Sequence, residues 1–143
     1  MRATVLLTCL LCVAACAREP SAADVAVTFL ELYALSVDQE GALTLASGLA
    51  KEKLLRELAD VAVIRGEGFR AGMQRPKFRR ELLRTDREGE KNVLYTYRIA
   101  MTHEIGEETA RRMLIHVEKQ TGGWRVVDYQ FWPDTGAPAA PTE

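Results

Sequence analysis

The fold is decided by residues 93–101, which read VLYTYRIAM. Apolar or aromatic side chains alternate with the positions between them, at Val93, Tyr95, Tyr97, Ile99 and Met101. A period of two residues predicts a β-strand with one buried face. Residues 113–117 repeat the alternation, and residues 124–132 follow a Thr121-Gly122-Gly123 hairpin turn. This half of the chain therefore predicts an antiparallel meander.

Upstream of the meander, residues 78–85 form a weaker and more charged strand, which is suited to the edge of a sheet. Three helices precede it. Ser21 and Asp24 form a capping-box signal for the first, and Asp38 caps a second over residues 39–46. The third ends near Gly66, and its buried face is predicted at Leu54, Leu58, Val61 and Ala62. The order of elements predicts an α+β domain, with three N-terminal helices on one face of a four-stranded antiparallel sheet.

Length and composition agree with a single folded domain. The chain has 143 residues, of which 48% are hydrophobic and 27% are charged. The formal net charge is −1, which argues against a nucleic-acid-binding protein because such proteins carry a basic excess.

The N-terminus reads MRATVLLTCLLCVAAC and has the pattern of an export signal. Its uncharged run, residues 3–15, is shorter than the ~20 residues that span a bilayer but suits a signal peptide. Val13-Ala14-Ala15-Cys16 resembles the bacterial lipobox. That resemblance implies cleavage after Ala15 and diacylglycerol on the sulfur of Cys16. We therefore expect a lipoprotein signal peptide at 1–15 and a tether at 16–20. The mature chain then has no cysteine available for a disulfide or a zinc site, because all three cysteines lie in this segment.

Three segments resemble the nuclear transport factor 2-like superfamily: SAADVAVTFL (21–30), ALTLA (42–46) and GGWRVVDY (122–129). Within it, the chain is most similar to small bacterial lipoproteins with a domain of unknown function. The resemblance covers about residues 20–132, and we place the domain at 21–132. It implies a curved, cone-like sheet wrapped around a long helix, often with an apolar pocket. Residues 133–143 are rich in Pro, Ala and Thr and are predicted to be a disordered tail.

The apolar strand face supplies the candidate pocket. Its residues are Tyr95, Tyr97, Ile99, Met113, Ile115, Val117, Trp124, Val126 and Tyr129. In the last strand, either Trp124 and Val126 or Val127 and Tyr129 face inward, because a one-residue slip turns every side chain over. The same residues could instead form a core against the helices, and pockets and cores share this composition.

Basic residues concentrate between positions 65 and 87, with eight bases against three acids. The candidate basic surface consists of Arg75, Lys77, Arg79, Arg80 and Arg84. It could contact anionic lipid headgroups or an acidic partner protein. Alternatively, these charges protect an edge strand from pairing with another sheet.

The sequence holds no recognisable catalytic or metal-binding motif, and no cofactor is expected. Asp128 is the only acid within the last strand, His116 has the parity of the outer face, and His103 is predicted in a loop. The leading hypothesis is a lipid-anchored, non-catalytic envelope protein that binds a partner protein or a small apolar ligand. The alternative is a small envelope enzyme with acid–base chemistry in the cone, using Asp128 and a tyrosine. Ala17 after the modified cysteine implies, by resemblance, the outer membrane facing the periplasm in a Gram-negative host.

Overall fold

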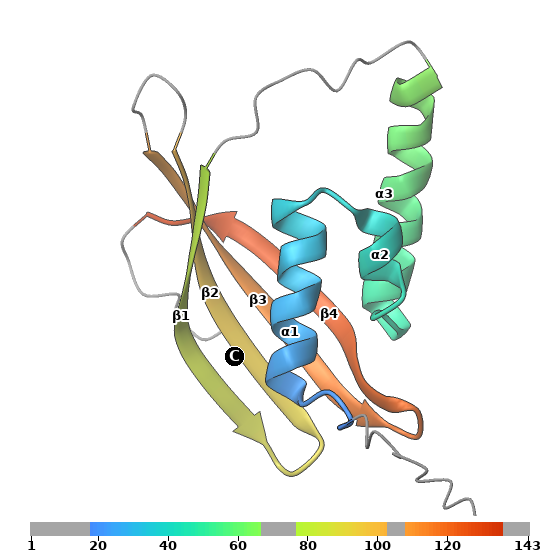
Figure 1. Ribbon diagram of the computed structural model, residues 1–143, viewed down its shortest axis with the longest axis vertical. Coiled ribbons are helices and arrows are strands. Elements are labelled where there is room, and N and C mark those ends of the chain that lie inside the picture. The colour runs from blue at the N-terminus through green and yellow to red at the C-terminus, as the bar shows by residue number, and fades with distance from the viewer. Residues whose placement is uncertain (1–17, 67–76, 103–107, 136–143) are drawn as a thin grey trace, which may run out of the picture.

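The computed structural model describes residues 18–66, 77–102 and 108–135 (Figure 1). Several predictions lie outside the described residues. They are the signal peptide at 1–15, the lipidated Cys16, the basic Arg75, the loop around His103 and the tail beyond residue 135. Everything below concerns the described part of the chain.

The three predicted helices are present on the N-terminal side of the sheet. They are α1 (Ala22–Leu30), which continues into a π-helical turn η1 (Glu31–Leu35), α2 (Gln39–Leu43) and α3 (Gly48–Gly66). Ser21 and Asp24 form the predicted capping box at the start of α1. The Asp38 carboxylate accepts a hydrogen bond from the Gly41 amide at 2.8 Å and caps α2. The second helix is shorter than predicted, because residues after Leu43 turn and join the edge of the sheet.

Replacing Ser21 with alanine is expected to lower the free energy of unfolding by about 1 kcal/mol. The Ser21 hydroxyl accepts from the Asp24 amide at 3.2 Å, and the Asp24 carboxylate accepts from the Ser21 amide at 2.9 Å. The Ser21 hydroxyl also donates to the Asp24 carboxylate at 2.7 Å, and this hydrogen bond, followed by the one from the Ser21 amide, lowers the pKa of Asp24. The contribution of Asp24 is therefore present at neutral pH and is lost as the pH falls through the lowered pKa. Urea denaturation at neutral and acidic pH measures both effects. An alanine variant as stable as the wild type at neutral pH would contradict this role of the cap.

The four strands are β1 (Lys77–Glu88), β2 (Asn92–Thr102), β3 (Glu108–Gln120) and β4 (Gly123–Pro133). They pair antiparallel in the order β1-β2-β3-β4, which confirms the α+β class and the edge position of β1. The helices lie on one side of this twisted sheet (Figure 1). Helix α1 contacts β2, β3 and β4, whereas α3 contacts β4. The last strand runs one residue past its predicted end.

A β-bulge settles which residues of β4 face inward. Val117 pairs with Val126 and His116 pairs with Asp128, so Val127 is an extra residue. The bulge reverses the alternation at that point, and both Val126 and Tyr129 are consequently buried. The neighbouring segment also covers this edge, since the Ser47 amide donates to the Val126 carbonyl and the Val126 amide donates to the Leu45 carbonyl.

The core lies between α1 and the inner face of the sheet. Phe29 is fully buried, and its ring centroid lies 5.7 Å from that of Tyr33 and 5.3 Å from that of Tyr129. In α3, Leu54 is fully buried, but Ala62 is exposed and the prediction that it faces the core is wrong. Figure 1 shows the reason: the C-terminal half of α3 extends beyond the part of the sheet that its first half contacts.

Candidate ligand-binding site

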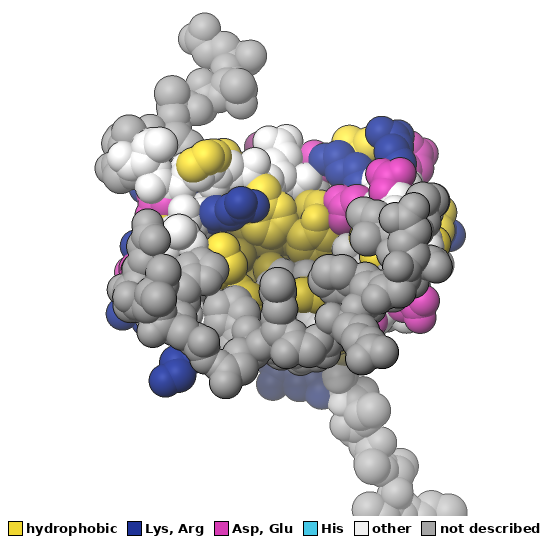
Figure 2. Space-filling model, turned by 90° about the horizontal axis from the view of Figure 1, so that it is seen from above, with side chains coloured by type: hydrophobic (Ala, Val, Ile, Leu, Met, Phe, Trp, Pro, Cys, Tyr) yellow, Lys and Arg dark blue, Asp and Glu magenta, His cyan; other side chains and the backbone are white. Residues whose placement is uncertain are grey.

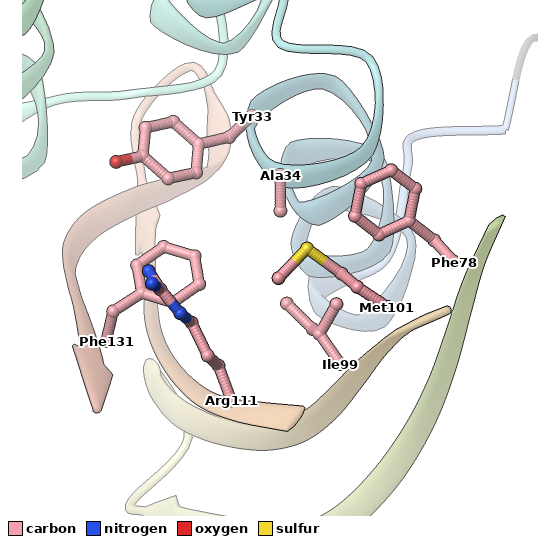
Figure 3. A pocket seen from close by; sticks show the side chains of 7 residues that line it. All are labelled: Tyr33, Ala34, Phe78, Ile99, Met101, Arg111 and Phe131. Atoms are coloured by element: carbon pink, nitrogen blue, oxygen red, sulfur yellow. The ribbon is translucent and has the colours of Figure 1, made fainter. Parts of the chain in front are cut away.

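A cavity of about 360 Å³ opens at one end of the sheet. Figure 2 views the molecule from this end and shows hydrophobic side chains gathered in a hollow. The volume lies at the small end of the ~300–1,000 Å³ that ligand sites occupy. The described side chains that line it are Tyr33, Ala34, Phe78, Ile99, Met101, Arg111 and Phe131 (Figure 3).

Strand geometry brings these side chains together. Phe78 is near the start of β1 and pairs with Met101 near the end of β2, while Ile99 pairs with Arg111 near the start of β3. Because neighbouring strands are antiparallel, these positions share one end of the sheet. They also continue the inward-facing alternation of the core. Turn η1 supplies Tyr33 and Ala34 above them, so the cavity forms where the helical layer ends (Figure 3).

The hydroxyl of Tyr33 is directed away from the apolar lining of the cavity (Figure 3). Burial, followed by a hydrogen bond to Glu57, raises the pKa of Tyr33 to about 12. Burial and Glu57 also raise the pKa of Tyr129, whose hydroxyl donates to Glu57 Oε1 at 2.8 Å. Both phenols therefore stay protonated near neutral pH. In Figure 3 the Tyr33 hydroxyl points away from Met101 and Ile99, so Tyr33 offers the cavity its ring.

Asp128, the acid that sequence analysis selected for proton transfer, is tied to helix α3. Its Oδ1 lies 2.6 Å from Lys53 Nζ and accepts a hydrogen bond from the Tyr129 amide at 2.8 Å. Lys53 also donates to the Tyr129 carbonyl at 2.8 Å. Asp128 is not among the described residues that line the cavity. The contacts it makes join α3 to β4.

The predicted pocket residues are mostly core residues. Eight of them are buried between the helices and the sheet: Tyr95, Tyr97, Ile99, Met113, Ile115, Val117, Val126 and Tyr129. Trp124 is half-buried at the core margin, with Lys119 Nζ 5.6 Å from its ring centroid. Ile99 alone also lines the cavity. Most of the nine predicted pocket residues therefore pack in the core between the helices and the sheet.

Several cavity residues were not predicted as pocket residues. Met101, Arg111 and Phe131 each extend a strand's inward-facing series by one step, from Ile99, Met113 and Tyr129 respectively. Phe78 could have been found as the β1 partner of Met101. The signal was therefore present in the alternation, at positions closer to the strand ends.

The candidate basic residues that are described all lie on β1, but strand alternation divides them between two faces. Arg80 pairs with the inward-facing Ile99 and forms an ion pair with Glu31. Arg79 and Arg84 pair with residues of the other parity. Arg84 Nε lies 2.7 Å from Asp86 Oδ2. Lys77 lies on the same face of β1 as Arg79. The basic residues consequently do not form one uninterrupted surface.

His116 lies on the outer face of β3, as its parity predicts, with Nε2 3.1 Å from Asn92 Oδ1. Within the described ranges, no group of His, Cys, Asp or Glu side chains could hold a metal ion. No helix in the same ranges is long and apolar enough to cross a membrane. In comparisons with known proteins, no protein-family model matched the chain and no curated protein matched it.

Proposed function

We propose that this protein is a non-catalytic, lipid-anchored lipoprotein of the cell envelope, whose domain binds a small apolar ligand in the cavity. Cys16 carries the lipid, and the protein faces the periplasm from the outer membrane. The domain belongs to the nuclear transport factor 2-like superfamily, and its sheet forms a curved, cone-like wall of the cavity. The cavity lined by Phe78, Ile99 and Met101 is the observation that carries the ligand-binding part of the proposal.

The position of the tether supports an arrangement in which the cavity points away from the membrane. Lys119 Nζ lies 2.5 Å from Glu19 Oε1, so the chain just after Cys16 reaches the hairpin between β3 and β4. Arg111 and the cavity lie at the opposite end of β3. At ~3.3 Å per residue, about 26 Å of strand separate Arg111 from Lys119. The ligand therefore enters from the aqueous side.

Filling the cavity is expected to abolish most ligand capture. In Met101→Trp, the indole occupies apolar space, so a neutral alkyl diazirine should no longer label Phe131. Leu94→Trp is the matched control, because Leu94 is half-buried on the opposite parity of the same strand. After photolysis of the complete chain in lipid nanodiscs, peptide mapping by mass spectrometry measures labelling at Phe131. Equal labelling of Phe131 in both variants, or its absence in the wild type, would contradict the proposed site.

A further inference from the structure

We propose that Arg111 makes the cavity selective for a single-chain apolar molecule that carries one anionic headgroup, specifically a monocarboxylate. This inference rests on the proposed ligand-binding function and names the class of its ligand. The chemistry is an alkyl or aryl body among Phe78, Ile99 and Met101, with its carboxylate at the Arg111 guanidinium (Figure 3).

The first argument is the position of Arg111 on the inner face of β3. It pairs with Ile99 on one side and with Pro133 on the other. Its parity is that of Met113, Ile115 and Val117, which are fully buried. Arg111 is thus the next inward-facing residue of β3 after these apolar side chains, and it lies at the cavity. Its side chain is exposed at the mouth, where a headgroup can reach it without burial of the charge.

The second argument is that the charge of Arg111 is not neutralised within the described part of the chain. Arg98 and Arg112 both donate to Asp134, with Nε–Oδ distances of 2.7 and 2.9 Å. Arg80, the other arginine on the inner side of this end, pairs with Glu31. The guanidinium of Arg111 forms no ion pair or hydrogen bond with another described residue.

The third argument is that Arg111 is the lining residue equipped to recognise a headgroup. It alone among the seven described lining residues carries a charge, and the Tyr33 hydroxyl points away from Met101 and Ile99 (Figure 3). A guanidinium offers paired N–H donors in the geometry that matches a carboxylate. The volume of about 360 Å³ suits one short chain or ring. Because the cavity opens away from the tether, we assign the ligand to the soluble pool and not to the bilayer that holds the protein.

The test compares octanoate with octanamide, which has nearly the same shape but no charge. The complete chain, in phosphatidylcholine nanodiscs, is titrated while the methyl signals of Ile99 and Met101 are followed by NMR. Octanoate is expected to bind about tenfold more tightly than octanamide, as hydrogen bonds to charged groups are stronger than neutral ones. Arg111→Gln should lower octanoate affinity about tenfold and leave octanamide affinity unchanged. Arg111→Lys should retain part of the preference.

Arg79→Gln is the matched control. It also removes one positive charge, but from the outer face of the sheet, and should change neither the octanoate nor the octanamide affinity. If octanoate and octanamide bind equally and Arg111→Gln changes nothing, the inference is overturned while the proposed apolar site stands. If neither compound shifts the signals of Ile99 and Met101, the inference and the proposed function both fail. If Arg79→Gln and Arg111→Gln lowered octanoate affinity equally, the effect would come from the net charge of the protein and not from Arg111, and the inference would also be overturned.

Discussion

Replacing Phe29 with alanine is expected to lower the free energy of unfolding by about 3–5 kcal/mol. The side chain is fully buried and stacks with the ring of Tyr33 at a centroid distance of 5.7 Å. It also contacts the ring of Tyr129, which anchors α3 to β4 through Glu57. Truncation removes apolar burial and leaves a void that this rigid ring cluster cannot close. The loss is a large part of the ~5–15 kcal/mol that stabilises a typical domain.

Urea denaturation followed by far-UV circular dichroism measures this loss. Leu55→Ala on α3 is the matched control, because Leu55 is 48% exposed and its truncation should cost less than about 0.5 kcal/mol. If Phe29→Ala and Leu55→Ala had similar midpoints, Phe29 could not lie at the centre of the core.

Replacing Cys16 with serine is expected to move nearly all of the protein out of the washed membrane fraction. The proposed thioether then cannot form, and the protein loses the acyl chains, each of which contributes about 0.8 kcal/mol per buried CH₂. The remaining apolar run at residues 3–15 is shorter than the ~20 residues needed to span a bilayer. An alkaline wash of the membranes should therefore extract the serine variant and leave the wild type behind.

Cys12→Ser provides the control, since Cys12 lies in the same apolar run but is removed by the proposed cleavage. Intact-mass measurement should show a wild-type chain that begins at Cys16 and carries acyl mass. Retention of Cys16→Ser in the washed membranes, or a wild-type chain without added hydrocarbon, would refute the lipid anchor.

Local patterns were sufficient to predict most of the secondary structure. The capping signals at Ser21 and Asp38 mark helix starts, and the alternation from Val93 marks the central strand. The inward residues of β4 could not be predicted, because two alternations fit the same stretch equally well. The choice depends on the bulge at Val127 and on the pairing of Val126 with Ala46, which is far away in the sequence.

The candidate site was harder to predict than the fold, because the cavity forms where the helical layer stops covering the inner face of the sheet. Ile99 and Tyr95 lie on the same face of β2, yet only Ile99 reaches the part of the sheet beside the end of η1. The sequence pattern identifies the face but not how far the helical layer extends along it. Two consecutive arginines, Arg111 and Arg112, are typical of a solvent-facing strand end, so the sequence alone does not select Arg111 as a cavity residue. The alternation from Met113 gives the face on which Arg111 lies, but only the pairing with Ile99 places it beside the cavity.

The most direct measurement of the central claim is the distance between a bound apolar ligand and the cavity wall. Isotope-filtered NMR of the complete chain with octanoate can detect nuclear Overhauser effects from the ligand to individual methyl groups. Our account predicts contacts to the methyl groups of Ile99 and Met101, with none to Leu94, which lies on the opposite face of β2. Contacts to Leu94 in place of Ile99 and Met101 would show that the ligand associates with the outer face of the sheet, and the binding site proposed here would be wrong.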